Sequence, residues 1–111
     1  MKVKEKMEGD IAVLTVSGNM MGGPDSTALH DKIKSLIADG LSKVVIDIHG
    51  VKWMNSSGLG ILIGAVTTLK NNGGKLIIVN VSERIANLLK ITKLSGVFDI
   101  EQDIDSAVIK F

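Results

Sequence analysis

The sequence lacks cysteine and has very few aromatic residues. Its 111 residues include no Cys, no Tyr, one Trp and two Phe. The lack of thiols excludes disulfides, cysteine-ligated zinc, iron–sulfur clusters and thiol catalysis. With only His30 and His49, far apart in the chain, as imidazole ligands, we predict no metal site. The scarcity of aromatic rings leaves almost no surface on which single-stranded bases could stack.

The chain also lacks an excess of charge of either sign. Thirteen Lys and Arg residues oppose twelve Asp and Glu residues, giving a net charge of +1. So small a charge does not attract nucleic acid or an anionic membrane. No run of about 18 apolar residues could span a bilayer, and the charged first residues lack the apolar segment of a signal peptide. We therefore expect a cytoplasmic protein whose partners include neither nucleic acid nor a membrane.

The length and the hydrophobic pattern predict one α/β domain over residues 1–111. Hydrophobic residues make up 45% of the chain, which is enough for one core and too little for two domains. The apolar pattern predicts strands, the first two forming a hairpin, at 2–8, 11–16, 44–48, 76–79 and 97–100. Helical spacing predicts helices at 24–39 and 58–70, after Ser82, and from about Asp103. This alternation indicates a mixed, mostly parallel sheet with an N-terminal β-hairpin and about four helices.

A glycine-rich segment joins the strand at 44–48 to the helix at 58–70. Residues 51–60 read Val-Lys-Trp-Met-Asn-Ser-Ser-Gly-Leu-Gly. Such a segment lies at the carboxyl ends of the strands, where open parallel sheets bind ligands and partners. Ser56 and Ser57 fall in the expected N-cap region, where a hydroxyl accepts a hydrogen bond from a free helix N–H. Taken alone, this local sequence favours a capped helix with no further role.

Several stretches, in order along nearly the whole chain, resemble the STAS domain of bacterial anti-sigma factor antagonists. They are Val-Val-Ile-Asp-Ile at 44–48, Met-Asn-Ser-Ser-Gly-Leu-Gly at 54–60, Gly-Gly-Lys-Leu at 73–76, Val-Asn-Val-Ser at 79–82 and Leu-Leu-Lys-Ile-Thr-Lys-Leu at 88–94. The resemblance implies a partner-switching protein. In that family the first Ser of the pair, here Ser56, is phosphorylated by an anti-sigma factor that is itself a serine kinase, and a PP2C-type phosphatase removes the phosphate. The unmodified antagonist binds the anti-sigma factor and frees the sigma factor. ATP belongs to the kinase, so no cofactor is implied for this chain.

The residues around Ser56, with the loop at 19–23, are predicted to contact this partner. The predicted contact residues are Asn55, Ser57, Gly58, Gly60, Met20 and Met21. Small glycines leave room for a partner backbone, and methionine adapts to irregular surfaces, although local packing explains the two methionines equally well. The chain departs from many relatives in having Asn55 where they have Asp, and in lacking an acidic residue in the 19–23 loop.

Two further residues near this segment have alternative interpretations. Trp53 could anchor a partner, but a lone Trp more often covers the core, and we favour packing. Asp47, near the end of a buried strand, is predicted to shape the loop before Ser56 by accepting backbone hydrogen bonds.

Other function classes receive less support from the sequence. A serine hydrolase would need a base beside Ser56 and the Gly-x-Ser-x-Gly pattern, and both are missing. The segment also lacks the third glycine of a dinucleotide-binding fingerprint, and no phosphate-binding P-loop is present. The alternative function is a non-switching STAS module that binds a nucleotide or a lipid-related ligand, or that forms a subunit of a transport or sensory assembly.

Overall fold

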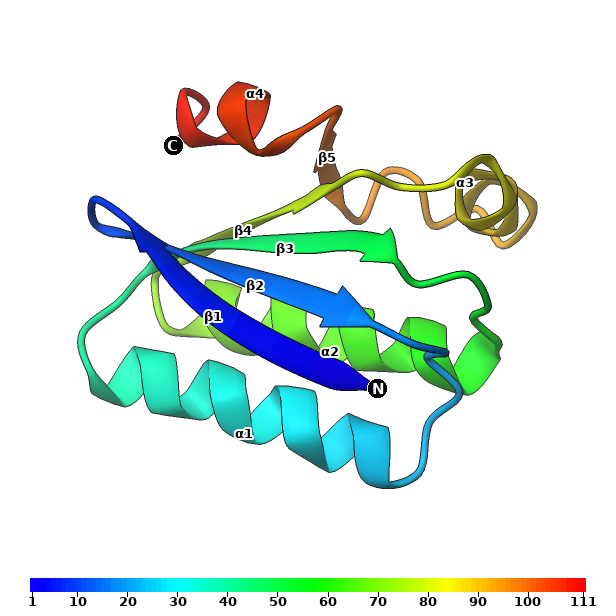
Figure 1. Cartoon of the computed structure of the whole chain (residues 1–111), viewed down its shortest axis with the longest axis horizontal. Coiled ribbons are helices and arrows are strands. Elements are labelled where there is room, and N and C mark those ends of the chain that lie inside the picture. Colours follow the sequence, from blue (N-terminus) through cyan, green and yellow to red (C-terminus); the bar gives the residue numbers. More distant parts are fainter.

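The computed structural model describes the backbone of residues 1–111 and the side chains of all except residues 24–26. One sheet of five strands, in the order β1-β2-β3-β4-β5, carries helices on both faces (Figure 1). β1 and β2 are antiparallel, and the other neighbours are parallel. The elements are β1 (Lys2–Glu8), β2 (Ile11–Ser17), α1 (Pro24–Ala38), β3 (Lys43–Gly50), α2 (Ser56–Asn71), β4 (Lys75–Val79), α3 (Glu83–Ile91), β5 (Asp99–Glu101) and α4 (Ile104–Val108). The predicted α/β class, with its N-terminal hairpin and mostly parallel sheet, is confirmed.

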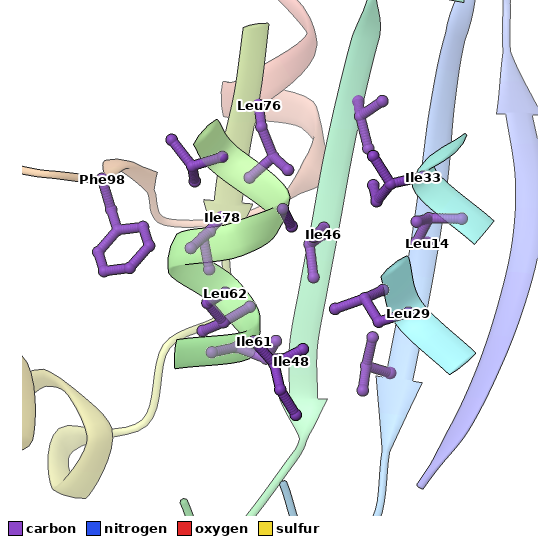
Figure 2. Packing of buried hydrophobic residues seen from close by; sticks show 14 of the residues in the cluster. Leu14, Leu29, Ile33, Ile46, Ile48, Ile61, Leu62, Leu76, Ile78 and Phe98 are labelled. Carbon is purple, nitrogen blue, oxygen red and sulfur yellow. The ribbon is translucent and has the colours of Figure 1, made fainter. Parts of the chain in front are cut away.

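The larger part of the core lies between the sheet and helices α1 and α2. Because successive strand residues point to opposite faces, every second residue of β2, β3 and β4 faces these helices. Figure 2 shows this packing for Leu14 of β2, Ile46 and Ile48 of β3, and Ile78 of β4, against Leu29 and Ile33 of α1 and Ile61 and Leu62 of α2. Burial of each such side chain contributes about 1.5–3 kcal/mol. This layer holds α2, and with it the Ser56 segment, in a fixed position relative to the strand ends.

The short helix α4 covers the other face of the sheet. Ala107 is fully buried there, and Ile104, Val108 and Phe111 pack around it. They cover the apolar residues of β2, β3 and β4 on this face, which are Ile11, Val13, Val45, Ile77 and Val79. β3 and β4 are therefore buried on both faces, which is the physical reason for their nearly continuous apolar sequences.

Several element boundaries differ from prediction by one or two residues. The second helix begins at Ser56 and not at Gly58. The last strand is shorter and later than predicted, at Asp99–Glu101, and Phe98, which precedes it, is part of the hydrophobic core. In the part of the chain that the structure describes, no helix is long and apolar enough to cross a membrane.

Candidate functional site

The carboxyl ends of β2 and β3 bring two loops side by side in front of α2. Regular pairing of these strands ends at Ser17 and Gly50. Beyond it, Met20 and Met54 form an isolated parallel bridge, in which the Met20 N–H donates to the carbonyl oxygen of Trp53 at 2.9 Å. The loop after β2 is therefore held against the segment that carries Ser56.

Asn55 is the N-cap of α2. Its Oδ1 accepts a hydrogen bond from the Gly58 N–H at 2.8 Å, and its Nδ2 donates to the carbonyl oxygen of Met21 at 3.2 Å. The prediction that Ser56 and Ser57 lie in the cap region is therefore wrong, since they are the first two residues of the helix. Asn and Ser cap helices about equally well, but the side chain of Asn55 carries a separate oxygen and nitrogen, which here cap the helix and donate to the neighbouring loop.

Ser56 and Ser57 both have exposed side chains at the positive end of α2. Among the described residues, none forms a hydrogen bond to either side-chain hydroxyl. The two serines differ in their surroundings, because a Cβ placed on Gly22 would lie 2.7 Å from the Cβ of Ser57. Ser57 thus packs against the loop after β2 through its own Cβ.

The two glycines of the segment occupy opposite environments. Gly58 is buried, and a Cβ placed on it would lie 1.7 Å from the carbonyl oxygen of Met20. We predicted that the backbone of a partner approaches this glycine closely. The backbone that does so is that of Met20 in the same chain. Gly60 is exposed with open space where a side chain would be, so its role as a partner contact stays a prediction.

The structure separates the two methionines of the 19–23 loop. Met20 is fully buried, so the interpretation as a partner contact is wrong for its side chain and the packing interpretation holds. The bridge to Met54 turns Met20 inward, as a continuation of the strand. Met21 follows it and is 43% exposed.

Trp53 does not cover the core, contrary to our preference for packing. It is 51% exposed, in a loop beyond the end of the sheet. The guanidinium carbon of Arg84, from α3, lies 3.8 Å from the centroid of its ring. The role of Arg84 was not predictable from the sequence, because no spacing rule relates an arginine on one helix to an aromatic residue in a distant loop.

Asp47 forms a hydrogen-bond network at the ends of β3 and β4. Its Oδ1 accepts from the His49 backbone N–H at 3.0 Å, from His49 Nδ1 at 2.9 Å and from Asn80 Nδ2 at 3.0 Å. Burial raises the pKa of Asp47, but these hydrogen bonds outweigh it and bring the pKa below the ordinary value of 3.8. The predicted acceptance of a backbone hydrogen bond is confirmed, but its donor, His49, lies within β3, so the shaping of the loop before Ser56 stays a prediction. Among the described side chains, no group of three or more acidic or imidazole ligands could hold a metal ion.

With this fold and site, the chain belongs to the STAS domain family, whose model matches residues 2–107. It is similar to the anti-sigma-B factor antagonist of Bacillus subtilis (strain 168), with 33% identity over 104 residues, covering 91% of this chain and 90% of the relative. The fold is similar to that of the anti-sigma factor antagonist SpoIIAA in its unphosphorylated form, with a TM-score of 0.73, 18% identity and coverage of 98% and 96% of the two chains. The phosphorylated form of Bacillus SpoIIAA gives a TM-score of 0.73 and 19% identity, with coverage of 98% and 97%.

Proposed function

We propose that this protein is an anti-sigma factor antagonist that acts as a phosphorylation-gated partner switch. The unphosphorylated form binds an anti-sigma factor that is also a serine kinase, and phosphorylation of Ser56 releases that partner. A PP2C-type phosphatase restores the binding form. The chain is the substrate of both enzymes and is not an enzyme itself.

The observation that carries this proposal is the exposed hydroxyl of Ser56 at the first position of α2, which accepts or donates no hydrogen bond among the described residues. Asn55 caps the helix, so a phosphate on Ser56 removes no hydrogen bond that the fold needs. A phosphate adds about −1.5 to −2 charges, which the backbone N–H groups and the dipole of a helix N-terminus tolerate. Phosphorylation therefore leaves the fold intact and acts on the surface.

The partner surface lies around that hydroxyl. Its exposed members are Met21, Asn55, Ser57 and Gly60, together with Ser56. A phosphate at its centre must lose its hydration shell when the partner docks, which disfavours the complex by several kcal/mol. Ser56 is the better phosphate acceptor of the two serines because Ser57 packs against Gly22.

Two findings on similar proteins support the proposal. The Bacillus subtilis relative, similar along nearly its whole length, is named an anti-sigma-B factor antagonist. SpoIIAA, which has the same fold, occurs in phosphorylated and unphosphorylated forms.

Phosphopeptide mapping of the protein from its native cells tests the modification site. We expect one phosphate, on the peptide containing Ser56, which a serine/threonine phosphatase removes. A phosphate on Ser57 alone, or an unmodified peptide under all growth and stress conditions, would contradict the proposal.

Binding measurements test the switch itself. We expect Ser56→Ala to bind the kinase as tightly as the unphosphorylated protein does, and Ser56→Asp to bind at least about tenfold more weakly, because each 1.4 kcal/mol of lost affinity is tenfold. The kinase is isolated with Ser56→Ala as bait and measured by calorimetry. Thr67→Asp is the matched control, since it adds the same charge to an exposed position farther along α2. Equal affinities for Ser56→Ala and Ser56→Asp would refute the switch.

A further inference from the structure

Trp53 and Arg84 form a wall between two adjacent pockets on the surface. The loop after β3 supplies Trp53 and α3 supplies Arg84, and these two elements lie at the same end of the sheet (Figure 1). Both side chains line both pockets, one of about 410 Å³ and the other of about 250 Å³. A ligand larger than either pocket could therefore occupy both by crossing this wall.

The larger pocket, which we call the basic pocket, has basic side chains in its lining. It is lined by Lys52, Arg84 and His49, together with Val51, Trp53 and Ser82. None of these described lining residues is acidic. The buried carboxylate of Asp47 accepts a hydrogen bond from His49 Nδ1, so His49 contributes less to the pocket than Lys52 and Arg84. Lysine and arginine together suit a phosphate or carboxylate group.

The smaller pocket, which we call the apolar pocket, has Arg84 as the one charged residue among its described lining residues. Its lining between the loop and α3 includes Met54, Ile85, Leu88 and Ile91, with Asn87 at its polar side. Ile91 is 79% exposed, which leaves an apolar side chain of α3 without cover in the described chain. A buried alkyl group here would remove this apolar surface from water, at about 0.8 kcal/mol per CH₂.

We propose that the two pockets together bind a small anionic amphiphile, a molecule with a phosphate or carboxylate head and a short alkyl chain. The head lies in the basic pocket near Lys52 and Arg84, and the chain crosses the Trp53 ring into the apolar pocket. Taken together, the two pockets have a volume within the range of about 300–1,000 Å³ that is usual for small-molecule sites. Ser56 lines neither pocket, so this site is independent of the proposed phosphorylation switch.

The fluorescence of Trp53, the only Trp in the chain, reports directly on this wall. The full chain is titrated with octyl phosphate below its micelle-forming concentration. Inorganic phosphate and octyl glucoside test the head and the chain separately, octanoate tests a carboxylate head, and adenosine monophosphate tests a phosphate on a flat ring. We expect saturable binding of octyl phosphate or octanoate with a Kd at least tenfold lower than that of inorganic phosphate or octyl glucoside. The comparison of octyl phosphate with octanoate identifies the preferred head.

Variants in each pocket separate the site from unspecific adsorption. Lys52→Gln in the basic pocket and Ile91→Asn in the apolar pocket should each weaken binding of the better amphiphile at least tenfold. Both side chains are exposed, so neither change disturbs the core. Lys90→Gln is the matched control, because Lys90 is exposed on α3 and lines neither pocket.

The proposal is overturned if no amphiphile binds saturably, if octyl glucoside or adenosine monophosphate binds as tightly as the better amphiphile, or if Lys52→Gln and Lys90→Gln behave alike. Ser56→Asp should change amphiphile binding less than twofold. A partner switch without amphiphile binding, or amphiphile binding without a partner switch, would show which of the two proposals fails.

Discussion

Gly58 and Gly60 lie two residues apart in α2 but differ in the space available for a side chain. The Cα of Gly58 faces the backbone of Met20, at a point where both loops are held by the bridge between Met20 and Met54. A backbone carbonyl cannot rotate away as a flexible side chain can. Gly60 points into open space two residues later. The absence of a Cβ is therefore essential to the fold at Gly58 only.

Substitution by alanine should distinguish the two glycines. Gly58→Ala forces the 19–23 loop away from α2 and should lower the free energy of unfolding by about 3 kcal/mol. Gly60→Ala should raise it by about 0.5–1 kcal/mol, because alanine favours an exposed helix position. Urea unfolding followed by circular dichroism measures both. The interpretation of Gly58 would be wrong if both variants were as stable as the original chain.

At the scale of the element, α2 depends on Asn55 for both its beginning and its attachment. One amide caps the helix at the Gly58 N–H and donates to the Met21 carbonyl oxygen. The same side chain therefore frees the serines from capping and connects the two loops around Ser56.

Replacement of Asn55 should separate these two contributions. Asn55→Ala removes the cap and the contact between loops, and should cost about 1 kcal/mol of stability or somewhat more. Asn55→Ser keeps a capping oxygen but has no amide to donate to Met21, so it should recover most of that loss. The test compares the free energies of unfolding of the two variants and the original chain. An unchanged stability of Asn55→Ala would contradict the role assigned to Asn55.

At the scale of the whole molecule, Asp47 and Asn80 link elements that are distant in sequence. Asn80 donates its side-chain amide to Asp47 at the end of β3, and its backbone N–H to the carbonyl oxygen of Gln102, just after β5, at 3.2 Å. Asn80 has a φ of 59°, a conformation that asparagine adopts more readily than most residues. The ends of β3, β4 and β5 are thus held by one buried carboxylate and one amide.

This carboxylate should make stability depend on pH. Because the pKa of Asp47 in the folded chain is below the ordinary 3.8, ionised Asp47 stabilises the fold. Its contribution to stability is complete at pH values well above 3.8. It is lost as the pH falls through the lower pKa of the folded state. Asp47→Asn should be less stable by about 1–2 kcal/mol at pH 7, with a difference that shrinks in acid.

Urea unfolding from pH 7 to pH 3 measures this difference. Asp31→Asn, an exposed change on α1 that also removes one negative charge, is the control. A difference between Asp47→Asn and the original chain that stays constant over the whole pH range would contradict the assigned role.

The sequence by itself determined the fold class, the hairpin and the position of the Ser56 segment between a buried strand and a helix. These features depend on local patterns: alternating residues in β1, nearly continuous apolar residues in β2, β3 and β4, and helical spacing in α1 and α2. The starts of the helices after Ser82 and near Asp103 were also predictable, because each of these residues caps its helix by a hydrogen bond within the first turn.

Only the tertiary structure decided which residue caps α2, which methionine of the 19–23 loop is buried, and where Trp53 lies. Each of these outcomes depends on a contact between loops far apart in sequence: Asn55 with Met21, Met20 with Met54, and Trp53 with Arg84. Hydrophobic periodicity is a property of neighbouring residues, whereas these contacts form only when the sheet brings the ends of its strands together. The surroundings of Ser56 were therefore set by packing, although its place in the chain could be read from the sequence.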